Sequence, residues 1–428
     1  TLQKISTAFK EHGTQFDFRV MATHGGTIAW KAKELARTIV SGPIGGVIGA
    51  KYLGEVLGYR NIACSDIGGT SFDMALITQG ELTIKNDPDM ARLVLSMDSV
   101  GAGAGSFIHL DPYTKSIKLG PDSAGYRVGV CWADSGIDTI TISDCHMVLG
   151  YLNPDNFLGG AIKLDRQRSH DAIKEQLADP LGLSVEDAAA GVIELLDSEL
   201  RDYLRAMISG KGYSPSSFVC FSYGGAGPVH TYGYTEGLGF EDVIVPAWAA
   251  GFSAFGCAAA DFEYRYDKSL DINLASDAPA AQRQSASQTL QQAWDELTQN
   301  GLEEFELNGY TPDQVTLQPG YRMQYRGQLN DLEIEAPLDK VDSEADWLAL
   351  EQAFNDTYGR VYAASARSPE LGYSVTGAIM RGSVPTTKPR IPKEALGSET
   401  PDDSAFLGTR RFYRKKRWVD AQLYHMEA

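Results

Sequence analysis

Two glycine-rich loops, each directly after an apolar run, constrain more than any other feature how this chain of 428 residues can fold. The first, Asp66–Asp73, follows the apolar run of residues 61–65, and the second, Gly224–Pro228, follows residues 218–221. Buried strands that end in glycine turns are typical of α/β folds in which backbone amides bind phosphate. The two loops lie 158 positions apart, from Asp66 to Gly224, and their pairing is more informative than either loop alone.

The first loop has the residue types that a phosphate-binding hairpin needs. Gly68 and Gly69 let backbone amides approach an anion with no side chain in the way. Thr70 and Ser71 add hydroxyl donors. Taken alone, these residues also fit a tight hairpin in which the glycines serve only the turn.

Two carboxylates flank the same loop. Asp66, at the end of the strand, is placed to hold a water of a magnesium shell, because Mg²⁺ keeps several of its waters in proteins. Asp73 either ties the loop shut or reaches the same metal. We therefore predict Asp66, Thr70 and Asp73 as catalytic residues, with Asp66 at the metal.

The second loop leads from a strand into a helix. Paired glycines before a helix N-terminus suit phosphate or ribose, because the first amides and the helix dipole face the ligand. The pattern is weak alone, since it also occurs as a packing feature. We predict that the nucleotide is held here by Gly224, Gly225, Ala226 and Gly227.

Periodicity and turn residues predict the order of elements. One helix, 44–57, has a face of small residues that suits close packing. Another starts at a Ser184/Asp187 capping box and continues as an apolar stripe through Leu200, Tyr203 and Met207. Further helices are expected near 286–297 and over 347–362, and strands over 61–66, 72–78, 81–85, 218–221, 243–246 (buried), 321–334 and 373–384. Residues 385–408 predict a linker, and the basic run 410–417 an exposed strand or arm.

Composition excludes several classes of protein. A net charge of −18 argues against nucleic acid as a partner, and no apolar run is long enough for a membrane span. The five cysteines are scattered without metal-ligand spacing, which favours free thiols, and no secretory signal is visible. These features predict a cytoplasmic protein.

The chain resembles the hydantoinase A / 5-oxoprolinase family along nearly its whole length. The residues that carry the resemblance are 41–46, 66–73, 100–106, 119–125, 143–150, 224–230 and 325–328. The family implies ATP and Mg²⁺ as cofactors and adds Gly103 and Gly105 to the cofactor-binding residues. It also implies the second half of an actin-like ATPase fold over 1–275, an α+β domain over 276–385, and a linker with a basic terminal arm over 386–428.

The resemblance also leads us to expect a second hairpin. Family members open with another D-x-G-G-T-x-x-D loop, and this chain has one such loop, in the order typical of the second half. We therefore expect the first hairpin to lie upstream of Thr1. Residues 1–428 by themselves are then expected to bind nucleotide weakly and to show no ketone-dependent ATP hydrolysis.

Within the family, residues 245–252 and 261–267 are most similar to the HyuA-like (beta) subunits of acetone carboxylases. That resemblance implies phosphoryl transfer from ATP that activates a ketone and bicarbonate for acetoacetate formation. It implies as partners a hydantoinase B-like subunit with a manganese or iron ion and a small third subunit. Alternatives are acetophenone carboxylation, ATP-dependent opening of a hydantoin or 5-oxoproline ring, and a non-catalytic ATP sensor or scaffold.

Several histidines need separate treatment. His24 stands where the family usually has asparagine, and we include it among the catalytic candidates because a neutral imidazole can orient bicarbonate or act as a base. Packing against neighbours is the alternative for His24. His109, His146, His170 and His230 lack metal spacing and are expected to be structural, although His230 also lies close enough to the second loop to touch ribose or phosphate. The basic run is expected to contact a subunit or solvent.

Overall fold

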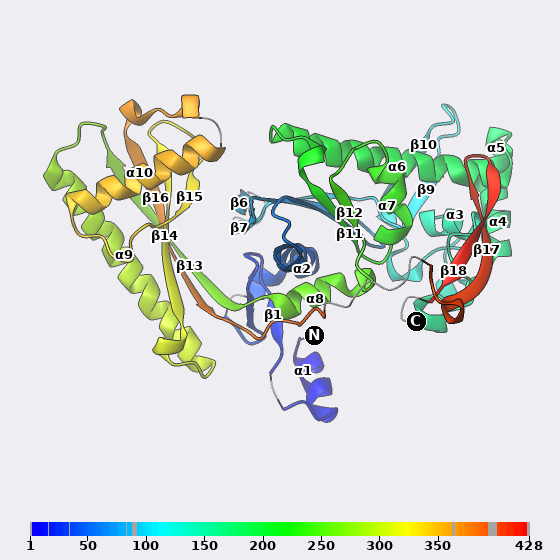
Figure 1. The fold of residues 1–428 in the computed structure, drawn as a ribbon, viewed down its shortest axis with the longest axis horizontal. Helices are drawn as coiled ribbons and strands as arrows, with labels where there is room; N and C mark the ends of the chain where they lie inside the picture. The colour runs from blue at the N-terminus through cyan, green and yellow to red at the C-terminus, as the bar shows by residue number, and fades with distance from the viewer. Residues whose placement is uncertain are drawn as a thin grey trace. The chain divides into compact units, whose positions relative to one another are not determined.

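The computed structural model describes residues 2–15, 17–33, 35–82, 84–87, 92–361, 364–392 and 400–425. The chain forms two compact units, each assembled from separate stretches of sequence (Figure 1). Unit 1 comprises Thr1–Ser41, Asn86–Val94 and Ala260–Lys388, and unit 2 comprises Gly42–Lys85, Leu95–Ala259 and Pro389–Ala428. Both units mix helices with strands, so the expected mixed α/β character is confirmed.

A six-stranded sheet forms the centre of unit 2. Its strands lie in the order β12 (Asp242–Ile244), β11 (Val219–Tyr223), β3 (Ile62–Ile67), β4 (Phe72–Thr78) and β5 (Glu81–Leu82), and β8 (Met97–Val100) also pairs with β4. β11 runs parallel to β3 and β12, whereas β4 is antiparallel to β3. β3 and β11 are almost wholly buried, as their continuous apolar runs predict.

Helices α6 (Val185–Gly210) and α7 (Gly227–Thr235) share one apolar core with α3 (Ile142–Val148) and α4 (Arg166–Ile173). The predicted stripe on α6 is wrong at Tyr203, which is 47% exposed, while the predicted Met207 packs against the edge of the core. Leu204 and Ile208 are the fully buried residues of these last turns. Steps of three and of four both keep to one helix face, and only the packed neighbours decide between adjacent positions such as Tyr203 and Leu204.

The small face of α2 (Ser41–Leu57) permits two close contacts. Toward the sheet, a side chain at Gly46 would collide with the ring of Tyr223 on β11. On the other side, Gly49 lies against Gly256 of α8 (Phe252–Ala259), with only 3.1 Å between a Cβ built at Gly49 and the Gly256 Cα. The expected close packing is confirmed, and it involves a helix as well as the sheet.

Unit 1 is a sheet with two helices on it. The strand order is β1 (Arg19–Met21), β2 (Thr27–Ala29), β13 (Phe262–Leu274), β16 (Tyr373–Val384), β14 (Thr316–Tyr325) and β15 (Leu332–Glu335). Trp294 of α9 (Ala280–Leu307) donates to the Gly320 carbonyl at 2.8 Å, and Tyr321 donates to the Leu350 carbonyl of α10 (Glu344–Val361) at 2.7 Å. The helices and strands expected beyond residue 280 are therefore confirmed.

The grouping of segments differs from the expected boundaries at 275 and 385. β2 pairs with β13, and the Thr27 amide donates to the Asp261 carbonyl at 2.8 Å, so the N-terminal segment joins the sheet of unit 1. The C-terminal hairpin of β17 (Phe406–Arg414) and β18 (Arg417–Tyr424) joins unit 2, where the Tyr413 amide donates to the Leu149 carbonyl at 2.8 Å. These are long-range contacts that composition does not reveal.

Three smaller expectations also need correction. β12 is an exposed edge strand rather than a buried one, since Val243 is 38% exposed and Val245, just beyond it, 41%. The capping box of α6 is half formed, because the Asp187 side chain accepts a hydrogen bond from Tyr413 instead. The helix α1 (Leu2–Glu11) was not predicted.

The remaining elements are short. They are β6 (Ile84–Asp87), β7 (Arg92–Leu95), β9 (Ser106–Leu110), β10 (Ile117–Ser123) and α5 (Asp179–Leu181). All five cysteines are free, as expected. Among the described residues, no helix combines the length and apolar character that a membrane span requires.

The contact between α2 and α8 predicts a stability difference between two glycines. A methyl group at Gly256 would collide with the Gly45 carbonyl, whereas one at Gly251 would meet nothing within 4 Å. We expect Gly256→Ala to lower the free energy of unfolding by about 2 kcal/mol or more, the scale of overpacking. Thermal melting of Gly256→Ala beside the control Gly251→Ala tests this, and equal melting temperatures would contradict it.

Candidate nucleotide site

The two predicted loops meet at one edge of the unit 2 sheet. In the parallel pairing of β3 with β11, Asp66 lies opposite Tyr223, so both strands end at the same place. The Ala226 amide donates to the Ile67 carbonyl at 2.9 Å, which joins the second loop directly to the first. Gly224 has φ +86°, and a Cβ there would collide with the Asp66 carboxylate. Only glycine permits this approach.

The tip of the first hairpin presents free backbone amides. Within the described residues, the amides of Gly69, Thr70 and Ser71 donate to no acceptor, and the Thr70 hydroxyl has no partner. The Gly68 amide is different, since it donates to the Ser71 carbonyl at 3.1 Å and closes the turn. Gly69 and Thr70 are exposed. Three adjacent free amides on a tight turn are the donor arrangement that binds phosphate oxygens.

Two carboxylates lie at the base of this hairpin. Asp66 and Asp73 are direct cross-strand partners on β3 and β4. Burial, and then the charge of Asp73, raise the pKa of Asp66 from an ordinary value of 3.8 to about 6, although Ser253 donates to Asp66 at 3.4 Å. Asp73 accepts a hydrogen bond from Ser71 at 2.8 Å. The pair therefore carries an unneutralised negative charge that a cation would stabilise.

The glycine-rich segment of residues 100–106 packs against the hairpin and supports it. A Cβ at Gly103 would lie 2.6 Å from the Thr70 amide nitrogen, and one at Gly105 would lie 2.8 Å from the Gly69 carbonyl oxygen. Their own amides are used inside the protein, by Ser106 Oγ at 2.8 Å and by the Gly69 carbonyl at 2.7 Å. Gly103 and Gly105 therefore support the loop within the protein, and their predicted part in cofactor binding stays a prediction.

The second loop is also divided in its roles. The Gly224 and Ala226 amides are used by the Ala249 and Ile67 carbonyls, both at 2.9 Å, so neither is free for a ligand. Gly225 is exposed, and a Cβ there would meet nothing within 4 Å. Gly227 begins α7, whose first amides lack partners in the helix. Direct contact is therefore open to Gly225 and Gly227.

His24 and His230 are both buried side chains. His24 belongs to unit 1, where it is buried and its Nε2 lies 3.2 Å from the Glu263 carbonyl oxygen. Burial, and then the charge of Arg37, lower the pKa of His24 to about 3, so its imidazole is neutral and a weak base. His230 is buried on α7, and its Nδ1 lies 2.7 Å from Asp197 of α6. These surroundings favour packing roles, and the catalytic role of His24 stays a prediction.

Ser253 was missed by sequence reasoning. It lies on α8, and its hydroxyl reaches Asp66 although the two residues are 187 positions apart. No local motif indicated it. The signal was indirect, in the small face of α2, which lets α8 lie close to the sheet.

Comparison with known proteins gives matches along the whole chain. The sequence model of the hydantoinase/oxoprolinase family matches residues 1–266, and that of its C-terminal domain matches residues 277–428. The beta subunit of acetone carboxylase from Xanthobacter autotrophicus is 83% identical over all of this chain and 60% of its own length.

Solved structures give the same picture. A nucleotide-free acetone carboxylase matches with a TM-score of 0.86 and 82% identity, covering 100% of this chain and 61% of its own. An ATP-dependent caprolactamase from Pseudomonas jessenii matches with a TM-score of 0.76 and 27% identity, covering 99% and 61%. The chain thus spans about three fifths of the length of these relatives.

The raised pKa of Asp66 predicts a pH-dependent gain in stability from Asp66→Asn. Because the folded-state pKa of this acid is raised, its ionisation costs stability as pH rises from about 4 through 6. In metal-free buffer at pH 8, we expect Asp66→Asn to be more stable than the wild type by about 2 kcal/mol, with the difference disappearing near pH 4. Urea denaturation across this range measures it. Asp122→Asn, on exposed β10, is the control, and a constant difference at every pH would contradict the prediction.

Proposed function

The chain belongs to the hydantoinase/oxoprolinase family, and from that premise we propose that it is the nucleotide-binding part of an ATP-dependent acetone carboxylase. The observation that carries the nucleotide assignment is the group of three free amides, Gly69 to Ser71, above the carboxylate pair Asp66 and Asp73. The assignment to ketone carboxylation is supported by the 83% identity to an acetone carboxylase beta subunit.

The carboxylate pair fits a magnesium ion. Two neighbouring acids, one with a pKa raised toward 6, form a hard oxygen donor set with uncompensated charge. Asp66 would hold the ion directly or through its waters, with Asp73 and the Thr70 hydroxyl beside it. A bound magnesium ion would supply charge neutralisation for the phosphates of ATP.

In this proposal the chain acts chiefly by positioning and electrostatics. The free amides of Gly69, Thr70 and Ser71 hold phosphate oxygens and stabilise the charge that spreads over a transferring phosphoryl group. Gly225 leaves room for the nucleoside beside the start of α7. Because these donors belong to the backbone and rest on Gly103 and Gly105, they keep their geometry without reorganisation.

Three finer assignments belong to the same proposal. We infer that unit 2 corresponds to the second half of an actin-like fold, because a phosphate hairpin precedes a nucleoside loop in sequence. The hydantoinase B-like subunit, the small third subunit and the metal of the partner are proposed from the family resemblance, as is a cytoplasmic location. The substrates, acetone and bicarbonate, are proposed from the same relatives.

Opening of a cyclic amide is the second candidate function. The caprolactamase shares the fold with a TM-score of 0.76, so the same loops can serve a lactam. The identity of 27%, against 82% for the acetone carboxylase structure, favours the ketone.

Product analysis separates the two functions. The full-length protein with its partner subunits should form acetoacetate from acetone, bicarbonate and ATP, and should hydrolyse no ATP when a lactam replaces acetone. Lactam-dependent ATP hydrolysis without acetone-dependent hydrolysis would overturn the carboxylase proposal.

Removal of the Asp66 carboxylate tests the phosphate site. Asp66→Asn in the complete complex should lower substrate-dependent ATP turnover by about 10²-fold or more, the scale for loss of one preorganised electrostatic group. Asp122→Asn should leave turnover unchanged. Wild-type turnover in a folded Asp66→Asn complex would contradict the assignment.

A side chain at Gly225 tests the nucleoside side. Gly225→Val should weaken ATP binding by about tenfold or more, because the isopropyl group fills space that the protein itself leaves open. Its melting temperature should stay near that of the wild type. The matched control is Gly251→Val, also beside open space in unit 2. Early unfolding with unchanged affinity would show that the loop serves packing.

A further inference from the structure

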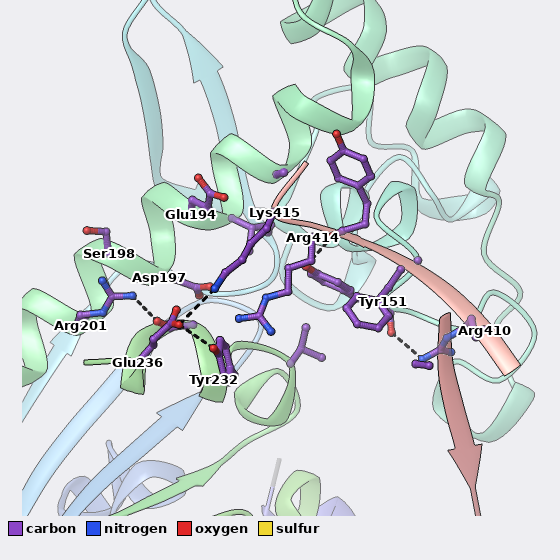
Figure 2. Close-up of a pocket in the computed structure, with 18 residues that line it drawn as sticks. Tyr151, Glu194, Asp197, Ser198, Arg201, Tyr232, Glu236, Arg410, Arg414 and Lys415 are labelled. Atoms are coloured by element: carbon purple, nitrogen blue, oxygen red, sulfur yellow. Dashed lines mark hydrogen bonds and ion pairs between the residues drawn. The ribbon is translucent and has the colours of Figure 1, made fainter. Parts of the chain in front are cut away.

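A cavity of about 600 Å³ lies within unit 2, between α6, α7 and the β17–β18 hairpin. Its position is separate from the loop residues described above, none of which lines it. One wall comes from α6 and α7, and the opposite wall from the hairpin, whose side chains extend across the opening (Figure 2). The volume is within the range of small-molecule sites, roughly 300–1,000 Å³.

Three guanidinium groups of this cavity have no carboxylate partner. Arg201 donates to the Gly233 carbonyl at 2.5 Å, and its Nε is buried without a hydrogen bond. Arg410 donates to the Tyr151 carbonyl at 3.3 Å. Arg414 lies over an aromatic ring, and no described residue forms an ion pair with any of these three arginines. Arginine donors that form no ion pair remain available to an anion.

The charged side chains of the cavity suit a ligand that has both an anionic group and N–H donors. Lys415 is paired with Glu236 at 3.6 Å, and the three arginines exceed the two remaining carboxylates of the lining by one positive charge. Glu194 and Asp197 lie on the α6 wall. Carboxylates accept hydrogen bonds from N–H groups, whereas the arginines attract phosphate or carboxylate oxygens.

One cation of the cavity is stacked on an aromatic ring. The Arg414 guanidinium carbon lies 3.7 Å from the centroid of the Tyr232 ring. A guanidinium stacked on one face still offers its other face to a planar group, and nucleobases use such planes. Figure 2 shows Arg414 and Lys415 extending from the hairpin toward Tyr232 on α7 and toward Glu236, which directly follows that helix.

The hairpin is held firmly in this position. Tyr151 donates to the Tyr413 carbonyl at 3.0 Å, and Gly150 approaches the Arg411 carbonyl so closely that no side chain fits between them. Lys415 and Lys416 both have positive φ, 48° and 59°, at the turn of the hairpin. A two-residue type I′ hairpin turn requires this backbone conformation at both of its central positions.

We propose that this cavity is a second ligand site, which binds a mononucleotide with its base stacked on Arg414 and its phosphate between Arg201 and Lys415. The carboxylates of α6 accept hydrogen bonds from the amino group of the base. A simple anion would bind only to the arginines, and an uncharged ring would only stack on the guanidinium of Arg414. A ligand that carries both groups, at a size that fills 600 Å³, uses the whole cavity.

The proposed site shares one helix with the loop site. α7 starts at Gly227, in the second loop, and Tyr232 and Gly233 on the same helix line the cavity. The helix is fixed to α6, where a side chain at Gly233 would collide with Asp197 and where His230 contacts the same carboxylate. A ligand in the cavity therefore binds to the element that positions the nucleoside loop.

AMP binding to the full-length protein, in its complex, tests the proposal by calorimetry. The loop site is first weakened with Gly225→Val, and AMP should still bind to the cavity, at one equivalent per chain. In that background, Arg414→Ala should weaken the remaining binding by about tenfold or more, because it removes the stack and a charge. Arg414→Lys, which keeps the charge and loses the plane, should also weaken it.

Arg411→Ala is the matched control. Arg411 lies on the same strand, is paired with Asp420 at 3.6 Å, and does not line the cavity. This variant should bind AMP like its parent. In the Gly225→Val background, adenosine and ribose 5-phosphate should each bind at least about tenfold more weakly than AMP, since each lacks one of the two groups.

The outcomes separate this site from the loop site. Absence of AMP binding in Gly225→Val, or unchanged affinity on Arg414→Ala in that background, would overturn the second site. Ribose 5-phosphate binding as tightly as AMP would also overturn it, because the base would contribute nothing. If Gly225→Val leaves all AMP binding intact and Arg414→Ala removes it, the second site stands and the proposed loop site fails.

Discussion

The parallel pairing of β3 with β11 is the constraint on which the rest of unit 2 depends. It places Asp66 opposite Tyr223, so that two loops far apart in sequence start from the same edge of the sheet. A slip of one residue would turn every side chain of one strand to the other face. Gly224 would then leave the Asp66 carboxylate, and the Ala226 amide would lose the Ile67 carbonyl. The continuous burial of both strands is what makes such a slip costly.

From that edge, the site is built in layers of backbone. Gly103 and Gly105 lie under the hairpin, and the Gly68 amide closes its turn. The other amides at the tip donate to no acceptor among the described residues. A backbone amide fixed at both ends cannot turn away from a ligand, unlike a side-chain donor that must lose rotamer freedom. The glycines therefore serve two different needs. Gly103 and Gly105 allow close contact beneath the hairpin, and Gly225 leaves open space at the second loop.

The sequence predicted local features well and their long-range uses poorly. The strand at 72–78, the strand at 373–384 and the glycine loops follow from local composition and turn residues. Local composition does not reveal which backbone amides are free, because Gly103 and Gly69 look alike in sequence. Their different roles come from the β4–β8 pairing and from the contacts between the loops. The same holds for Ser253, whose contact with Asp66 depends on the packing of α8.

Helix α7 shows why local motif and distant packing must be considered together. Its first turn presents the amides that a nucleotide needs, but a helix of nine residues has little stability by itself. Its position comes from α6, through the Asp197–His230 contact, the absence of a side chain at Gly233 and the Arg201 bond to the Gly233 carbonyl. Because Arg201 and Asp197 also line the cavity under the C-terminal hairpin, the residues that hold α7 in place are the same residues that face that cavity.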